Sequence, residues 1–392
     1  MRGLLRCRGA VAVLAGALAV TCAAAATMPE GYRIEPVARG LDDPSALAAA
    51  PDGRIFVLER LGGDVLVFEN GEVSSSPLLH LDVAQGEQEG LLGIALDPDF
   101  GMNGHMYLYY TQVSPKTHRV VRYTVTGNQA ADPFVVVDDL GSATSGRDNG
   151  GGMAFGGDGM LYIGVGVFEN DAAAQDLGYL GGKILRVEPD GDVPSDNPYA
   201  GEPYPYNLIW ADGVRDPRGL AVNTNVGTLY GVDLYAEDGT CDELNVLRSG
   251  ETYGWDAVAC SAGAYTGPVD TFSPQIDASG VVSYVGDRYP DVTDDVFVSG
   301  SVASGVQMVL DRMSGADLDQ LESSQDLYDP AEDVCPTQLT AITQGADGWL
   351  YALSDDADGG TAGLYRVIYD TAGSGAAPRE ASGTSYIGMT LA

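Results

Sequence analysis

The sequence predicts an all-β protein, a six-bladed β-propeller of four-stranded antiparallel blades. Three observations lead to this fold class. Glycine (53) and proline (20) are frequent, and they separate short β-branched and aromatic runs, as expected of many short strands joined by turns. One hairpin-like phrase occurs six times. The copies recur at roughly 40 to 70 residues, which is typical of repeated all-β units that cannot bury both faces alone.

Each copy of the phrase has a turn of Asp, Asn and Gly followed by an alternating apolar strand. An Asp or Asn beside glycine supplies the positive φ that a tight hairpin requires. The six copies are PDGRIFVLE from Pro51, MNGHMYLYY from Met102, GDGMLYIGVG from Gly157, NVGTLYGVD from Asn225, DVTDDVFVSG from Asp291 and ADGWLYALSD from Ala346.

A second strand follows most copies. These strands are VLVFEN from Val65, RVVRYTV from Arg119, KILRVEP from Lys183 and LYRVIY from Leu364. We therefore expect each repeat to form a small antiparallel sheet, with a β-sandwich as the alternative all-β fold.

The N-terminal segment, residues 1–26, has the layout of a secretory signal peptide. Three arginines precede an apolar run that is too short to span a bilayer, and Ala24-Ala25-Ala26 forms a small-residue cleavage site. We expect the protein to be exported, to the periplasm or the medium, with the mature chain starting near Thr27. Lipoprotein processing at Cys22 is the less favoured alternative.

Residues 27–370 are expected to form the propeller, and residues 371–392 a C-terminal tail or linker. The tail is rich in small residues and lacks a strand period until its last few positions. Apart from the signal segment, no stretch is apolar enough to be a transmembrane helix.

The chain is strongly acidic, with a formal net charge of −36. Removal of the signal segment, with its three arginines and no acidic residue, would make this −39. Such a surface repels nucleic acid and anionic lipid. It suits salty surroundings or the collective binding of cations.

Three cysteines lie outside the signal segment: Cys241, Cys260 and Cys335. Export permits disulfides. A Cys241–Cys260 bridge would join neighbouring strands and contribute about 3 kcal/mol of stability. Cys335 would then be left over, although three cysteines admit three such pairings.

Six ordered phrases give the chain a resemblance to a known family. They are QEGLLGIALDPDF from Gln88, DNGGGMAFGGDGMLYIGVG from Asp148, AQDLGYLGGKILRVEPDG from Ala174, DNPY from Asp196, GVRDPRGLA from Gly213 and DELNVLRSGETYGW from Asp242. From about Gly31 to Tyr369 the chain resembles the glucose/sorbosone dehydrogenases. These are soluble quinoproteins that oxidise aldose sugars with pyrroloquinoline quinone (PQQ) and calcium.

The resemblance implies a cofactor site and a metal site. Gln88 matches a glutamine that touches the quinone, and Arg215 matches an arginine that packs against it. Asp216 stands where the family has asparagine, which adds a negative charge beside an anionic cofactor.

Glu243 and the main-chain carbonyl of Tyr253 match calcium-binding positions, and oxygen ligands suit this hard cation. The alternatives are that Arg215 forms a surface ion pair with Asp212 or Asp216, and that Glu243 caps a turn.

Asp148 occupies the position of the family's catalytic histidine, which takes the proton of the sugar hydroxyl. An exposed aspartate is a weaker base, with a pKa near 4, but burial can raise it. The three histidines, His80, His105 and His118, lie in or beside strand-like runs distant in sequence from Asp148. We therefore expect them to be structural or surface residues.

Several cations that would bind the three carboxylates of PQQ are missing. The phrase GSVASGV from Gly300 lacks the family's basic residue, and Gln338 and Thr340 replace an Arg-x-Arg phrase. Arg147 and Arg218 are the nearby cations that could partly substitute.

Two hypotheses about function follow. The first is an exported PQQ-dependent aldose dehydrogenase in which Asp148 is the base. The alternative is a propeller of the same descent that has lost the redox chemistry and binds a glycan, a metal or a partner protein. A calcium-dependent lactonase-type propeller has less support. The enzyme is favoured if Asp148, Arg215 and Gln88 meet at one mouth of the central channel together with at least two further cations.

Overall fold

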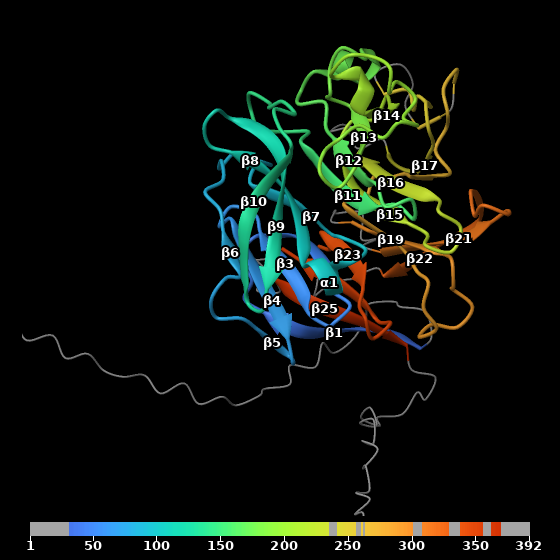
Figure 1. The fold of residues 1–392 in the computed structure, drawn as a ribbon. Coiled ribbons are helices and arrows are strands. Elements are labelled where there is room, and N and C mark those ends of the chain that lie inside the picture. The colour runs from blue at the N-terminus through green and yellow to red at the C-terminus, as the bar shows by residue number, and fades with distance from the viewer. Residues whose placement is uncertain are drawn as a thin grey trace, which may run out of the picture.

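Six antiparallel sheets form a ring, and the predicted six-bladed propeller is confirmed in the computed structural model (Figure 1). The structure describes residues 31–234, 241–255, 260–261, 263–300, 308–328, 338–355 and 362–369. The predicted signal peptide and tail, and Cys335, lie outside the described residues. No helix among the described residues is long and apolar enough to cross a membrane.

The first three blades follow one another along the chain. Blade 1 contains β2 (Pro44–Ala49), β3 (Ile55–Glu59), β4 (Asp64–Glu69) and β5 (Glu72–Val73), with β6 (Leu79–His80) also paired to β4. Blade 2 contains β7 (Leu91–Leu96), β8 (His105–Gln112), β9 (Thr117–Thr126) and β10 (Gln129–Val137). Blade 3 contains β11 (Gly150–Phe155), β12 (Leu161–Val165), β13 (Lys183–Val187) and β14 (Ile209–Asp212).

The last three blades complete the ring. Blade 4 contains β15 (Pro217–Val222), β16 (Leu229–Leu234), β17 (Asp242–Leu247) and β18 (Asp270–Phe272). Blade 5 contains β19 (Gly280–Ser283), β20 (Val296–Ser299), β21 (Met308–Ser314) and β22 (Gln320–Tyr328). Blade 6 contains β23 (Ala341–Gln344), β24 (Leu350–Ser354), β25 (Gly363–Tyr369) and β1 (Tyr32–Arg39). Three short helices lie in connections: α1 (Phe100–Asn103), η1 (Asp171–Gln175) and η2 (Tyr206–Leu208).

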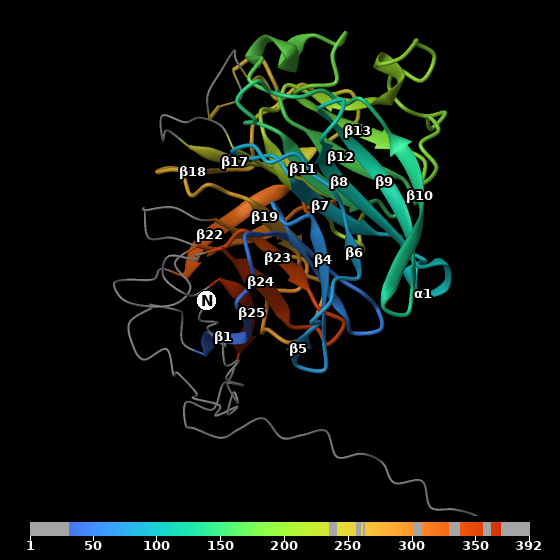
Figure 2. The same ribbon diagram turned by 90° about the vertical axis from the view of Figure 1, so that its left-hand side faces the viewer.

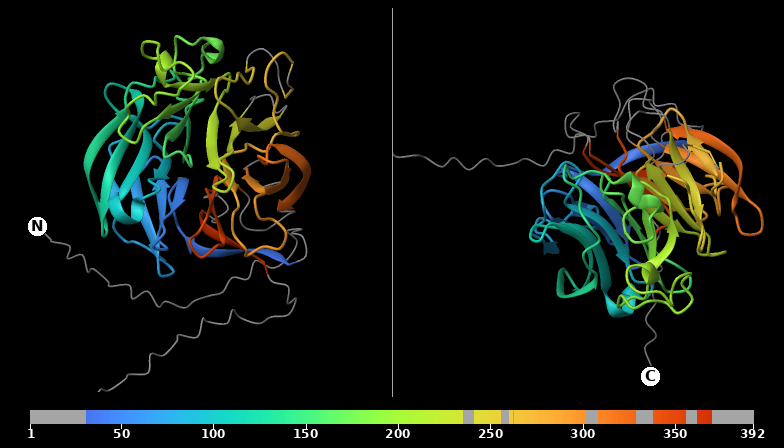
Figure 3. Two further views of the ribbon diagram at one scale, coloured as in Figure 1. Left: turned by 45° about the vertical axis from the view of Figure 1, so that its right-hand side comes forward. Right: turned by 90° about the horizontal axis from the view of Figure 1, so that it is seen from above.

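The two ends of the described chain close the ring in blade 6. Tyr32 of β1 pairs with Tyr369 of β25, and these two strands lie side by side (Figure 2). The other blades follow in chain order around the molecule (Figure 3). β1 is the outermost strand of this blade, and its pairing with β25 closes the ring by joining the two ends of the described chain.

Each repeated phrase supplies the turn into the second strand of a blade, together with that strand. Gly53 before β3 and Gly159 before β12 have φ of 92° and 79°, which a side chain would strain. In blade 5 the corresponding residue is Asp294, with φ 74°. An aspartate tolerates this region better than most residues, so the fifth copy keeps its turn without glycine.

The core lies between neighbouring blades. On β3, Phe56 and Leu58 belong to a buried cluster shared with blade 2, while Ile55 and Val57 belong to one shared with blade 6. Both faces of this strand are therefore buried, and its side chains are apolar at consecutive positions. The Cys241–Cys260 disulfide is also present, with Cα atoms 6.4 Å apart. It joins the residue before β17 to Cys260, which lies outside the strands, so the expectation that it would join neighbouring strands is wrong.

Candidate functional site

A central cavity of about 310 Å³ is lined by all six inner strands. Each inner strand contributes a small residue to its wall: Ser45, Gly93, Gly151, Gly219, Gly280 and Ala341. At Gly93 a Cβ atom would stand 2.0 Å from the carbonyl oxygen of Gly151, so only glycine allows β7 and β11 this close. The inner strands begin at the same end of the cavity. This end, called the mouth below, is formed by Asp43, Arg60, Glu87, Gln88, Asp216 and Arg218.

Asp148 lies two residues before β11, next to Asn149, which lines the cavity, and its backbone is held by Gln88. The N–H of Asp148 donates to Oε1 of Gln88 at 3.0 Å. The next residue, Asn149, donates its side-chain amide to the carbonyl oxygens of Gln88 and Gly146, both at 2.8 Å. The loops that precede β7 and β11 are thereby joined, which brings together two residues far apart in the sequence.

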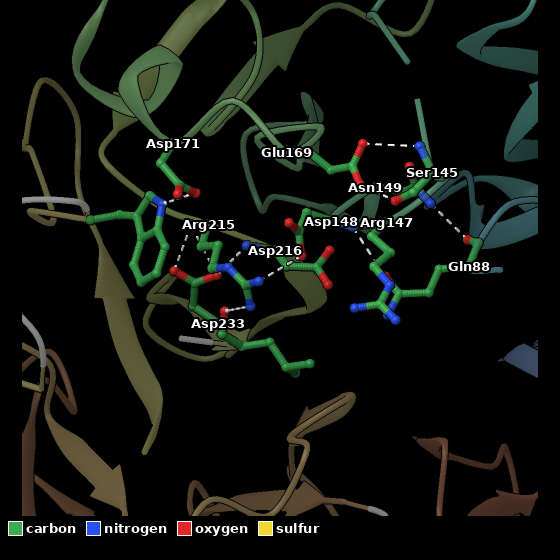
Figure 4. A network of polar contacts seen from close by, with 12 residues as sticks. Gln88, Ser145, Arg147, Asp148, Asn149, Glu169, Asp171, Arg215, Asp216 and Asp233 are labelled. Carbon is green, nitrogen blue, oxygen red and sulfur yellow. Dashed lines mark hydrogen bonds and ion pairs between the residues drawn. The ribbon is translucent and has the colours of Figure 1, made fainter. Parts of the chain in front are cut away.

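Arg215 forms a buried ion pair with Asp148 (Figure 4). Its Nη2 is 3.0 Å from Oδ1 of Asp148, and each side chain is only 9% exposed. The guanidinium lies 5.2 Å from the ring centre of Trp255, and its Nε is a buried donor with no hydrogen-bond acceptor in the part of the chain that the structure describes. The expected alternative, a surface pair with Asp212 or Asp216, is wrong, because Arg215 is buried and its ion-pair partner is Asp148.

Both carboxylate oxygens of Asp216 accept hydrogen bonds from donors within the protein. Oδ1 accepts the N–H of Gly150 at 2.7 Å, and Oδ2 accepts Nε of Arg218 at 2.8 Å. The aspartate that replaces the family's asparagine is therefore an acceptor here, and Arg218 compensates its added charge. Asp216 is 1% exposed.

Asp233, at the penultimate position of β16, supports the Arg215-Asp216 backbone. Its carboxylate accepts the N–H of Arg215 at 2.9 Å and that of Asp216 at 2.7 Å. Burial raises the pKa of Asp233 well above its usual range, and the nearby Glu243 carboxylate adds to this effect. Sequence reasoning did not select Asp233, although it ends the fourth repeated phrase.

Trp255 is a second residue that sequence reasoning did not select, although it ends the phrase from Asp242. Its indole N–H donates to Asp171 at 3.1 Å, and its carbonyl accepts the amide of Gln175 at 3.1 Å. Both partners lie in η1. The helix is fixed by Lys183, whose buried Nζ donates to the carbonyls of Ala173, Ala174 and Gly181 at 2.6, 3.0 and 2.9 Å. Lys183 therefore fixes, through η1 and Trp255, the surface on which Arg215 lies.

Four arginines occupy or adjoin the mouth, and each is paired with a carboxylate. The pairs are Arg60 with Asp43 (2.9 Å), Arg147 with Glu87 (2.5 Å), Arg215 with Asp148 (3.0 Å) and Arg218 with Asp216 (2.8 Å). The expected substitute cations, Arg147 and Arg218, are thus present but neutralised. Thr340 also lines the cavity and donates its hydroxyl to the Pro44 carbonyl at 3.2 Å. Because threonine is uncharged, this part of the wall gains no positive charge from it.

Glu243 lies within β17, opposite Asp233 of β16 in register, so the alternative that it caps a turn is wrong. Burial raises its pKa to about 7, against the opposing hydrogen bond from Asn245 at 3.2 Å. A buried carboxylate of this kind would gain from a hard cation. Among the described residues, however, His, Cys, Asp and Glu form no group of three that could hold a metal.

Tyr253, the other residue expected at the metal, is buried beside β14. Its N–H donates to the carbonyl of Asp212 at 2.9 Å, and its hydroxyl donates to the carbonyl of Val246 at 2.6 Å. On the other side of Gly254, the N–H of Trp255 donates to the carbonyl of Gly213 at 2.8 Å, so the segment that leads to Trp255 is held at both ends.

His118 lies closer to Asp148 than their separation in sequence suggests. Its ring stacks on Phe168 at 4.9 Å, and the N–H of Phe168 donates to the Asp148 carbonyl at 3.0 Å. The imidazole is fully buried between Thr111 and the Gly141 carbonyl, each at 2.8 Å. Burial lowers the pKa of His118 to about 4. The imidazole is therefore neutral, and through Phe168 it supports the backbone at Asp148, as expected of a structural histidine.

Comparison with known proteins adds the family context. The family model described as Glucose / Sorbosone dehydrogenase matches residues 41–366. Aldose sugar dehydrogenase YliI of Escherichia coli is 28% identical over 353 residues, which are 84% of this chain and 92% of the relative.

Solved structures agree with the sequence match. A putative glucose dehydrogenase of Thermus thermophilus is 29% identical with a TM-score of 0.75, covering 86% of this chain and all of the other. The PQQ-bound aldose sugar dehydrogenase of Streptomyces coelicolor is 26% identical with a TM-score of 0.71, covering 88% of this chain and all of the other.

Proposed function

Since the chain belongs to the glucose/sorbosone dehydrogenase family, we propose that it is an exported PQQ-dependent aldose dehydrogenase that oxidises the C1 hydroxyl of a sugar. The observation that carries this proposal is the meeting of Gln88, Asp148 and Arg215 beside the mouth. Arg60 and Arg218, two further cations, line the same cavity. This arrangement supports the enzyme over a degenerate propeller, although both cations are paired with carboxylates.

The residues at the mouth fit a planar, multiply charged cofactor in their chemistry. Among the described residues, Arg215 has a buried Nε–H without an acceptor, and Asn149 has a buried Oδ1 without a donor. Gln88 and Arg215 would hold PQQ, with Arg60 and Arg218 as further contacts. Asp216, also expected at the cofactor, does not fit this role, because both of its carboxylate oxygens accept donors within the protein. When bound, the quinone supplies the acceptor for a hydride from the sugar.

Asp148 is the proposed base. During oxidation, sugar C1 loses its hydroxyl proton and a hydride and becomes the lactone carbonyl carbon. The Asp148 carboxylate accepts the proton. Before the cofactor binds, that carboxylate is held by Arg215, whose Nη2 lies 3.0 Å from Oδ1 of Asp148. The positive φ of Asp148, 55°, turns the chain sharply before β11 and aims the residue toward its partners at the mouth.

Calcium and export are further parts of the proposal. Glu243 and the carbonyl of Tyr253 are the proposed calcium ligands, because a buried carboxylate and a main-chain carbonyl supply the oxygen donors that this cation prefers. The leader in residues 1–26 is proposed to direct export. Cleavage near Thr27 is checked by N-terminal sequencing of the exported protein.

The second candidate function is a glycan-, metal- or protein-binding propeller without redox chemistry. It is favoured by the four paired arginines, which leave no surplus positive charge among these pairs for a tricarboxylate. The two candidates differ in a simple measurement.

The test is reconstitution of the purified protein with PQQ and Ca²⁺. Dye reduction is followed with several aldoses, and melting temperature is measured in parallel. We expect turnover in the wild type, loss of turnover in Asp148→Asn, and activity in Asp148→His, which restores an imidazole base. Absence of both turnover and a thermal shift on adding PQQ would exclude the dehydrogenase and leave the binding propeller.

A further inference from the structure

The Asp148–Arg215 pair is the most deeply buried of the four pairs at the mouth. Its side chains are both 9% exposed, whereas those of Arg147 and Glu87 are 36% and 54% exposed. Solvent weakens an exposed pair, so Glu87 holds Arg147 only slightly. A buried pair is screened much less, and loss of one partner leaves a buried charge. Arg215 therefore depends on Asp148 more strongly than Arg147 depends on Glu87.

The guanidinium of Arg215 has little free bonding capacity. Nη2 contacts Asp148, Nη1 lies 3.5 Å from the carbonyl of Leu234, and the Trp255 ring lies against the guanidinium. Nε is a buried donor without an acceptor among the described residues. An anionic ligand that reaches Arg215 must therefore share the guanidinium with the Asp148 carboxylate or displace it.

We propose that Asp148 is an internal counter-ion that competes with the anionic cofactor for Arg215. This inference rests on the proposed function, in which Arg215 contacts PQQ. In the observed arrangement, Asp148 neutralises Arg215 and its carboxylate is engaged by the guanidinium. If Arg215 turned to a bound anionic cofactor, the Asp148 carboxylate would be released and could face the substrate. The same residue thus lowers cofactor affinity and becomes an available base only after loading.

The inference predicts opposite effects of one substitution on binding and on turnover. Asp148→Asn removes the competing charge but keeps the size of the side chain. We expect PQQ to bind Asp148→Asn about 10- to 100-fold more tightly than wild type, the range that one charge-assisted hydrogen bond represents. Turnover should be lost in the same variant. A residue with a purely structural role would weaken both properties together.

Glu87→Gln is the matched control. It also removes one negative charge beside the mouth, but from the exposed pair with Arg147. We expect its PQQ affinity to stay within about threefold of wild type, since exposed ion pairs contribute little. Binding is measured by quenching of tryptophan fluorescence as PQQ is added to each apoprotein in the presence of Ca²⁺.

The outcomes separate this inference from the proposed function. If wild type binds PQQ and Asp148→Asn binds no more tightly, Asp148 is not a competitor, while the dehydrogenase proposal stands. Equal gains in Asp148→Asn and Glu87→Gln would attribute the effect to net charge and overturn the inference. If neither wild type nor Asp148→Asn binds PQQ, the proposed function fails and the inference with it.

Asp148→His provides a second variant in case the asparagine protein does not fold. The imidazole carries no negative charge, so this variant should also bind PQQ about 10-fold or more tightly than wild type. Weaker binding than wild type in Asp148→His would contradict the proposal. Melting temperature of each apoprotein, measured without PQQ, establishes that the compared proteins are folded.

Discussion

Asp233 provides the sharpest test of how the site is held, because its carboxylate supports two successive backbone groups. It accepts the N–H of Arg215 at 2.9 Å and of Asp216 at 2.7 Å, and it is 2% exposed. Asp233→Ala leaves both donors without their acceptor, away from bulk water. Each buried donor left unpaired costs about 1–3 kcal/mol, so the free energy of unfolding should fall by about 2–6 kcal/mol.

Asp233→Asn should behave differently, because a single oxygen can serve both donors. Oδ1 lies 3.2 Å from the nitrogen of Arg215 and 2.7 Å from that of Asp216, and asparagine retains an oxygen at this position. Burial and the neighbouring Glu243 raise the pKa of Asp233, so a neutral side chain suits the site. We expect the free energy of unfolding to change by less than about 1 kcal/mol.

The assay is urea unfolding of wild type and both variants at pH 7, followed by tryptophan fluorescence. An unchanged denaturant slope would assign the differences to stability of the folded state. The reasoning is refuted if Asp233→Asn loses as much stability as Asp233→Ala, because charge would then matter more than the acceptor position. A loss below about 1 kcal/mol in Asp233→Ala would equally contradict it.

Three further predictions concern the scaffold around the site. Lys183→Met should lower stability at pH 7 by about 3 kcal/mol in urea unfolding, because three carbonyls lose a charged donor. Burial lowers the pKa of Lys183 from 10.5 to about 8, so the unfolded chain binds more protons between these values. Wild type should therefore gain stability relative to Lys183→Met as pH rises from 8 to 10.5, and an opposite slope would contradict this. Cys241→Ala/Cys260→Ala should lose about 3 kcal/mol, and a reductant should then no longer lower the melting temperature. Glu243→Gln should abolish any rise in melting temperature that Ca²⁺ causes in wild type, and an undiminished rise would place the metal elsewhere.

The repeated phrase allowed the blades to be predicted from sequence. All six copies became second strands, β3, β8, β12, β16, β20 and β24, and the four strands expected after them became β4, β9, β13 and β25. These features are local, since a turn residue with positive φ and an alternating strand are encoded within about ten residues. The closure of blade 6 by β1 depends on pairing between distant segments, which no local pattern specifies.

Within the site, the sequence predicted which residues come together more accurately than it predicted their ion-pair partners. Gln88, Asp148 and Arg215 do meet, but the ion-pair partners expected for Arg215 were Asp212 and Asp216, its neighbours in the chain. The observed partner is Asp148, at the start of the preceding blade's inner strand. The starts of the neighbouring inner strands β11 and β15 lie together around the axis, which places Asp148 within reach of Arg215.

The sequence by itself determined the all-β class, the sixfold repeat and the residues that mark the family, because turn chemistry and strand alternation act over short distances. Only the tertiary structure decided that Asp148 neutralises Arg215, that Asp216 is matched by Arg218, and that each of the four arginines described at the mouth has a carboxylate beside it. The physical reason is that electrostatic balance depends on distance and burial in space. Residues of different blades come close together and become buried only when the blades pack against one another in the ring.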